Sequence, residues 1–167
     1  MSTNNPVEAV VEGKILSLED AVALRNKWKD EKQKVVFTNG VFDILHAGHV
    51  KSLTNARTNG DKLIIGLNAD ASVKRLKGDA RPVINERDRA VLLAALQFVD
   101  LVVLFHDDTP IKLIEALLPD VLVKSADYNI ETIVGAKEVI ANGGEVKIMP
   151  FVQGLSTTAI INKIKNE

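Results

Sequence analysis

Two of the three histidines in this 167-residue chain lie close together, at positions 46 and 49 of the stretch TNGVFDILHAGHV. Strand-forming residues precede the stretch, the backbone can turn at Gly40, and Gly48 lies between the histidines. This order predicts a strand that ends near Gly40 and a helix that begins near Gly48. A helix amino terminus offers unpaired N–H groups and partial positive charge, which favour phosphate. Two imidazoles there can both donate to phosphate oxygens, although either histidine alone would more simply cap the helix or lie on the surface.

The elements that would position these histidines alternate along the chain. We expect strands at residues 34–40, 61–70, 99–105, 119–128 and 145–151. We expect helices at 16–33, 49–60, 86–98, 109–118, 131–144 and 156–165, with a short helix and a loop at 70–84. Ser17, Asn85 and Thr109 are candidate N-caps, and Gly60 is a candidate helix stop. Apolar strands that alternate with amphipathic helices predict an α/β protein with a parallel sheet covered on both faces.

Length and composition narrow the class of protein. We expect one domain overall, with a loose arm of about a dozen residues and a helix at 1–33 before the main part at 34–167. The formal net charge of −1 argues against bulk electrostatic binding to nucleic acid or acidic membranes. Cysteine is absent, which excludes a thiol nucleophile, a disulfide framework and a cysteine metal site. No apolar run reaches membrane-spanning length and the polar start is unlike a signal peptide, so we expect a cytoplasmic protein.

Ligands of parallel α/β sheets bind outside the carboxyl ends of the strands, so residues 38–49, 66–81, 124–128 and 151–158 are the segments to search. Lys124 ends an apolar strand, where a lysine is a poor core residue, and this favours a functional role. Lys77 and Arg81 lie in a basic loop that suits phosphate or is merely solvated. Ser156 is a simple N-cap candidate, and His106 beside two aspartates predicts a loop and cap rather than a metal site.

Several motifs together resemble the heptose 1-phosphate adenylyltransferases of the cytidylyltransferase-like nucleotidyltransferase superfamily. The His-x-Gly-His element marks the superfamily, and the segments RLKGDARPV and VLVKSADY indicate the heptose branch; AKEVIANGGEV and GLSTTAIINKI add to the match, which covers roughly residues 34–165. The resemblance implies a Rossmann-like, doubly wound sheet of five strands in the order 3-2-1-4-5. It also implies transfer of AMP from ATP to a heptose 1-phosphate, with release of pyrophosphate, a requirement for Mg²⁺ and self-association into a homo-oligomer. A separate kinase is then expected to supply the sugar 1-phosphate.

The residues and the resemblance together assign roles within this site. The expected catalytic residues are His46, His49, Lys124 and Arg89, with His49 the first choice for stabilising the transition state. Nucleotide binding is expected at Asn39, Gly40, Val41, Phe42, Gly48, Asp127, Ser156, Thr157 and Thr158. Acceptor binding is expected at Asp43, Asn68, Lys77 and Arg81, and no residue is assigned as a metal ligand, because phosphate oxygens and water can supply most of the Mg²⁺ shell.

Some assignments stay open. Arg89 is either a solvated surface arginine or the phosphate-contacting arginine that the resemblance implies, and Asp43 would either orient a histidine or meet the acceptor. Ser125 and Ala126 stand where the heptose enzymes usually carry two glycines, which leaves the fit of acceptor or base open. The alternatives are a cytidylyltransferase acting on glycerol 3-phosphate, which the lack of an arginine shortly before Ser156 disfavours, a nucleotide-binding module without catalysis, and a structural domain whose histidines only cap.

Overall fold

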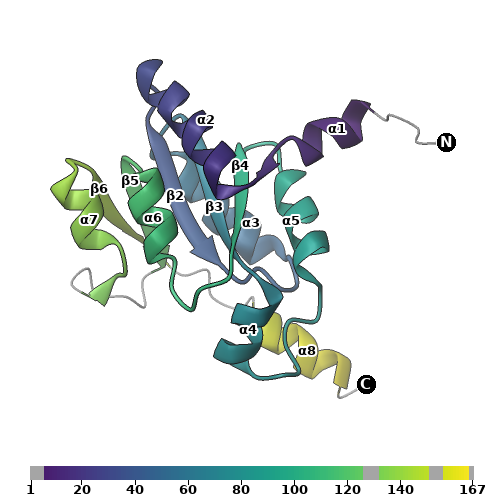
Figure 1. Ribbon diagram of the computed structural model, residues 1–167. Helices are drawn as coiled ribbons and strands as arrows, with labels where there is room; N and C mark the ends of the chain where they lie inside the picture. The colour runs from purple at the N-terminus through teal and green to yellow at the C-terminus, as the bar shows by residue number, and fades with distance from the viewer. Residues whose placement is uncertain (1–5, 126–131, 151–155, 166–167) are drawn as a thin grey trace.

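A computed structural model describes residues 6–125, 132–150 and 156–165. Six parallel strands form one sheet in the order β1-β4-β3-β2-β5-β6, with helices on both faces (Figure 1). The strands are β1 Ile15–Leu16, β2 Val35–Gly40, β3 Lys62–Asn68, β4 Leu101–Phe105, β5 Val121–Ser125 and β6 Glu145–Met149. The five expected strands are β2 to β6, and their neighbours follow the expected order, so the α/β parallel fold is confirmed.

The expected count of five strands is wrong by one, because β1 extends the sheet beyond β4. Ile15 pairs with Val102 and Leu16 with Val103. A strand of two residues is too short to produce a periodic pattern, so the sequence gives no signal for it. The loose arm expected at the amino terminus is also wrong, since helix α1 spans Pro6–Glu12 there. An ion pair between Glu12 and Arg87 links α1 to the main body.

Seven further helices follow: α2 Leu18–Asp30, α3 Ala47–Arg57, α4 Asp70–Lys77, α5 Glu86–Ala94, α6 Ile111–Leu117, α7 Ala136–Ala141 and α8 Thr157–Lys165. Ser17 and Asn85 are N-caps as expected, since their side chains accept backbone N–H groups of the first turn. Thr109 is not a cap, because the next helix begins one residue later with Pro110 at the N-cap position. Gly60 does not end α3 either. The Asn59 side chain donates to two carbonyls of the last turn and the helix ends at Arg57.

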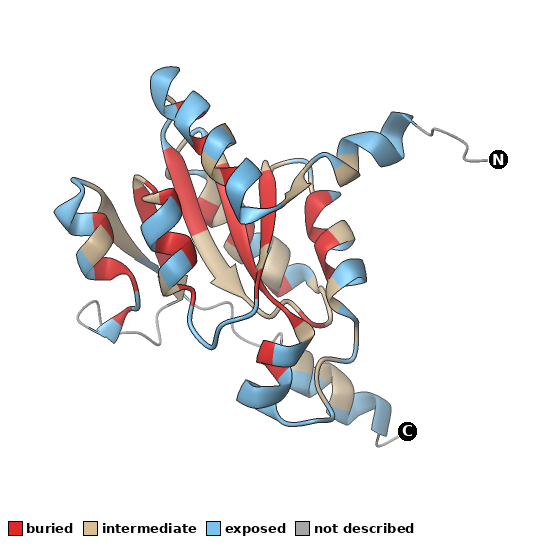
Figure 2. Ribbon diagram, viewed as in Figure 1, coloured by how far each residue is buried: buried red, intermediate tan, exposed pale blue. Residues whose placement is uncertain are grey.

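Two apolar clusters cover the two faces of the sheet. Phe37, Ile64 and Leu122 face α2, α6 and α7, whereas Val36 and Leu63 face α3 and α5. Neighbouring residues of one strand alternate between the clusters because side chains of a strand point to opposite faces. Figure 2 shows the result as central strands that are buried over most of their length. Each fully buried Leu or Ile side chain adds about 1.5–3 kcal/mol of stability.

The strand order creates the opening in which the site lies. From β2 the chain moves through β3 to β4 on one side, and it then crosses to β5 on the other side of β2. The connections after β2 and β5 therefore diverge at the carboxyl edge, and a crevice forms between them. Within the described part of the chain, no helix has the length and apolar character needed to cross a membrane.

Burial predicts a strong difference between two isoleucines. Ile64 is completely buried in β3, whereas Ile164 in α8 is 67% exposed. We expect Ile64→Ala to lower the free energy of unfolding by about 2–5 kcal/mol, because the substitution leaves a cavity in the core. We expect Ile164→Ala to change it by less than about 0.5 kcal/mol. Urea unfolding of both variants measures the difference, and equal losses would contradict the described core.

Candidate active site

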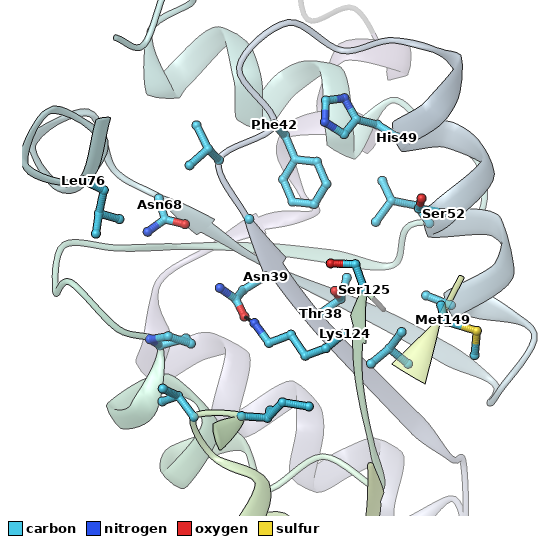
Figure 3. A pocket seen from close by; sticks show the side chains of 18 of the residues that line it. Thr38, Asn39, Phe42, His49, Ser52, Asn68, Leu76, Lys124, Ser125 and Met149 are labelled. Atoms are coloured by element: carbon cyan, nitrogen blue, oxygen red, sulfur yellow. Dashed lines mark hydrogen bonds between the residues drawn. The ribbon is translucent and has the colours of Figure 1, made fainter. Parts of the chain in front are cut away.

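A cleft of about 600 Å³ opens at the carboxyl ends of β2 and β5 (Figure 3). Phosphate-binding candidates and apolar residues from several elements meet there, including Leu76, Ile133, Val134 and Met149. The structure brings the following expected site residues together as its lining: Asn39, Gly40, Val41, Phe42, Asp43, His49, Asn68, Lys77, Arg81, Lys124 and Thr157. The crevice predicted from the strand order is therefore lined by most of the residues that were chosen from the sequence.

The two histidines begin helix α3. His46 is its N-cap, and the Gly48 N–H donates to His46 Nδ1 at 3.1 Å. Because Nδ1 accepts, the proton of the neutral imidazole lies on Nε2, which can donate outward. The rings of His46 and His49 are stacked, with centroids 3.9 Å apart and planes 22° from parallel. His46 thus has the capping role that the sequence allowed, and this role leaves one N–H for a ligand.

His49 lies in an environment that keeps its imidazole neutral. Burial lowers the pKa of His49 to about 4, and the neighbouring His46 and Lys77 charges lower it further toward that value. The edge of Phe42 contacts the ring, with centroids 5.3 Å apart. Burial also lowers the pKa of His46. Both imidazoles are therefore neutral donors near pH 7, and a bound anion would favour their protonation.

Lys124 brings a cation to the floor of the cleft. Its Nζ donates to Asn39 Oδ1, and Figure 3 shows the lysine directed at that amide from the neighbouring strand. Burial lowers the pKa of Lys124 to about 8, so the ammonium still predominates at pH 7. Asn68, at the end of β3, is buried and donates to Ser72 Oγ at 3.1 Å. Ser125 follows Lys124 and also lines the cleft, whereas Ala126 lies outside the described residues.

Arg89 lies beneath the cleft and is completely buried, so the surface alternative considered for it is wrong. Its Nε donates to the Ile84 carbonyl at 2.9 Å, and Nη1 donates to the carbonyls of Val41 and Asn68 at 2.6 and 2.9 Å. Nη2 pairs with Asp70 at 2.6 Å. All these contacts are with protein, and they join the ends of β2 and β3 to the starts of α4 and α5. The phosphate contact implied by the resemblance stays a prediction.

Asp43 is buried and joins the turn after β2 to the loop before α5. It accepts the N–H groups of Val83 and Ile84 at 2.8 and 2.9 Å, and Arg81 Nε at 2.5 Å. Burial alone would raise the pKa of Asp43, but these amides and the guanidinium outweigh that effect and lower it. Asp43 has no described hydrogen bond to His46 or His49. The Arg81 charge is already paired, although the residue lines the cleft.

The remaining predicted residues lie at the rim or outside the described part. Lys77 ends α4, is exposed and lines the cleft. Ser156 caps α8, because its Oγ accepts the Ala159 N–H at 3.1 Å, and Thr157 lines the cleft, whereas Thr158 is exposed. Asp127 lies outside the described residues.

Sequence reasoning missed several cleft residues. Ser52 lies three residues after His49 on α3, and this helical spacing could have identified it. Asp108 also lines the cleft and pairs with Arg75 at 2.6 Å. Its position depends on the loop between β4 and α6, for which the sequence carries no equivalent signal. No group of three or more His, Asp or Glu side chains suited to a metal ion occurs among the residues with described placement.

Comparison with known proteins decides the family. A sequence model of the cytidylyltransferase-like family matches residues 37–163. The chain belongs to this family. Membership confirms the nucleotidyltransferase class that the His-x-Gly-His stretch indicated, and the cleft lies where the strand order of this fold opens.

Curated relatives support the same placement. The chain is 56% identical over 151 residues to a bifunctional protein HldE of Mesorhizobium japonicum, covering 90% of this chain and 30% of the relative. It is 59% identical over 135 residues to that of Shigella sonnei, covering 81% and 28%. The chain thus spans about a third of the length of these relatives or less.

Solved structures agree on the fold. A lipopolysaccharide core biosynthesis protein from Thermoplasma volcanium is 29% identical, with a TM-score of 0.57, over 72% of this chain and 97% of that one. A pantoate-beta-alanine ligase from Francisella tularensis has a TM-score of 0.59 at 16% identity, over 92% and 78%, which shows a shared fold only.

The depressed pKa of His49 predicts a loss of stability in acid. The folded protein protonates His49 only near pH 4, whereas the ordinary value is 6.5, so the unfolded chain binds the proton first as the pH falls. Acidification from pH 6.5 to 4 therefore favours unfolding through this group. We expect the free energy of unfolding to fall less steeply across this range in His49→Gln than in the parent. His106→Gln, at an exposed position, is the control. Equal slopes in parent and His49→Gln would contradict the described burial.

Two aspartate–arginine pairs give a matched test of the loop that Asp43 holds. The Asp43 side chain is 1% exposed in its pair with Arg81, whereas Asp108 is 61% exposed in its pair with Arg75. We expect Asp43→Asn to lower the free energy of unfolding by about 3–5 kcal/mol, because Arg81 and the two amides lose their buried anion. We expect Asp108→Asn to cost at most about 1 kcal/mol. Chemical denaturation at pH 7 distinguishes them, and a similar loss in both would refute the buried anchor.

Proposed function

We propose that the protein transfers AMP from ATP to D-glycero-β-D-manno-heptose 1-phosphate and releases pyrophosphate, giving ADP-heptose for lipopolysaccharide core or a related surface glycan. The observation that carries the reaction class is the pair of neutral, stacked imidazoles at the start of α3, beside a cleft with Lys124 on its floor. The acceptor is supported by the resemblance of RLKGDARPV and VLVKSADY to the heptose branch and by the name of the Thermoplasma volcanium protein.

In the proposed reaction a phosphate oxygen of the sugar attacks the α-phosphorus of ATP, and the bond from that phosphorus to the bridging oxygen of pyrophosphate breaks. No covalent bond to the protein forms. Negative charge spreads over the phosphoryl oxygens, so the protein acts mainly by positioning and electrostatic stabilisation. His46 Nε2, the His49 imidazole and the amino end of α3 supply neutral and dipolar donors for that charge.

Lys124 and Lys77 supply the cations of the proposed site. Lys124 lies on the floor next to Asn39, and its depressed pKa keeps it able to lose a proton close to the working pH range. Lys77 reaches the cleft from the end of α4 and is exposed, so it can follow a bound triphosphate. Ser156, Thr157 and Thr158 would add hydroxyl groups and helix N–H groups at the start of α8. Asp127 and the backbone from Asn39 to Phe42 are proposed nucleotide contacts.

Arg89 and Asp43 are proposed as positioning residues. Arg89 fixes the carbonyls that end β2 and β3, and Asp43 fixes the loop at 81–84. Neither directs an unpaired charge at the cleft, since Arg89 is fully bonded to protein and Asp43 is paired with Arg81. Their contribution would be to hold the turn that carries the histidines in one geometry.

Mg²⁺ fits this site as a companion of the triphosphate. The carboxylates of Asp43 and Asp108 at the cleft are both paired with arginines, so phosphate oxygens and water would hold most of the ion's shell. When bound, the ion neutralises triphosphate charge. We also propose that the protein is a cytoplasmic homo-oligomer that acts on small molecules rather than nucleic acid, on the basis of the family resemblance and the net charge.

The assignment predicts both nucleotide preference and dependence on His49. Pyrophosphate release is measured with ATP, CTP, GTP and UTP, each with heptose 1-phosphate or glycerol 3-phosphate. We expect turnover with ATP and heptose 1-phosphate. His49→Ala should lower kcat by about 10²–10³-fold, because it removes a donor for the transition-state charge. His106→Ala is the matched control, since that side chain is exposed and does not line the cleft.

Each other outcome has a definite meaning. Activity only with CTP and glycerol 3-phosphate would replace the heptose assignment by the cytidylyltransferase alternative. Nucleotide binding without turnover for any acceptor would indicate a binding module. Full turnover in His49→Ala would remove this histidine from the mechanism.

A further inference from the structure

A second hollow, of about 480 Å³, opens at the opposite end of the sheet from the cleft. It lies where α2 ends and where β2, β5 and β6 begin. Four of its lining side chains are basic, namely Arg25, Lys29, Lys32 and Lys34, and two are acidic. The whole chain carries a net charge of −1, so this is a local concentration of positive charge.

Arg25 carries the argument because its guanidinium is buried and incompletely bonded. The residue is 3% exposed. Its Nη2 donates to the Leu118 carbonyl at 3.1 Å and to both oxygens of Asp120 at 3.2 Å. Its Nε and Nη1 have no hydrogen-bond partner among the described residues. A buried donor without a partner costs about 1–3 kcal/mol, more when charged, so these N–H groups call for an acceptor that the described protein does not supply.

The surrounding side chains indicate the charge of that acceptor. Glu145 pairs with Lys34 at 2.8 Å, and Asp120 pairs with Arg25. Lys29 and Lys32 line the same hollow, are exposed, and form no ion pair with a described residue. Both acidic residues are therefore already engaged, while two cations are available for an incoming anion.

The backbone at this edge does not oppose an anion as strongly as its helix end would suggest. Helix carboxyl termini carry partial negative charge on unpaired carbonyls. Here the last carbonyls of α2 accept the N–H groups of Glu31, Lys32 and Gln33. Lys32 adopts a left-handed conformation with φ of 57°, which glycine favours at helix ends. A lysine at that position keeps its charge beside the hollow despite the backbone cost.

Gln33 completes the set of donors. Its Oε1 is buried and has no described hydrogen-bond partner. Rotation of the terminal amide by half a turn would place the NH₂ group there instead, as a further donor. We propose that this hollow binds a small oxyanion of the phosphate class, separate from the candidate active site and independent of the reaction proposed for it.

The test follows backbone amide signals by ¹H–¹⁵N NMR while inorganic phosphate, and in a second series pyrophosphate, is added at constant ionic strength. We expect shifts of Gln33, Lys34 and Gly143 at the hollow, distinct from those of residues 39–49 at the cleft. Lys29→Ser with Lys32→Ser should weaken the shifts at the hollow about tenfold, because two charge-assisted contacts are lost. Shifts at the cleft should persist in this double variant.

A double variant at Lys27 and Lys137, each changed to serine, is the matched control. It removes the same charge from α2 and α7, and neither lysine lines the hollow. Its affinity at the hollow should equal that of the parent. The proposal is overturned if the parent shows shifts only at the cleft, if chloride at the same ionic strength reproduces the shifts at the hollow, or if both double variants bind equally.

Discussion

The buried guanidinium of Arg89 is the contact on which the arrangement of the cleft depends. Its three nitrogens bond to four segments that meet at the carboxyl edge of the sheet: the end of β2, the end of β3, the start of α4 and the loop before α5. A buried charge is tolerated only when it is paired and fully bonded, and Asp70 with three carbonyls meets that condition here. The backbone turn that leads from β2 to the histidines is thereby fixed from below.

Above this anchor, the charges of the site are graded by their surroundings. The stacked histidines are neutral near pH 7, Lys124 is a partly buried cation with a depressed pKa, and the Asp43–Arg81 pair is internally compensated. The cleft therefore offers donors and a modest positive field without strong charge of its own. Such a field suits a polyanion whose charge shifts during reaction, because stabilisation can grow as charge develops.

The sequence predicts those features that depend on local pattern. The apolar run of β3, the caps Ser17 and Asn85, and the His-x-Gly-His turn are each encoded within a few residues, and all appear as expected. Strand β1 has only two residues, so it forms through its pairing with β4 rather than through a pattern of its own. The direction of Arg89 is also tertiary, since its partner Val41 lies 48 residues away. The same holds for Asp43, whose partners come from a loop about 40 residues further along.

Strand β1 has a consequence for solubility that follows from its place in the sheet. β4 is flanked by β3 on one side, and without β1 its other side would present unpaired backbone N–H and C=O groups. An open strand edge of this kind is a template for pairing between molecules, and natural proteins cover such edges with short or irregular segments. Two residues held in place by α1 and α2 cover β4 here. The segment before the first long strand thus acts as protection against edge-to-edge aggregation, although it lies far from the cleft.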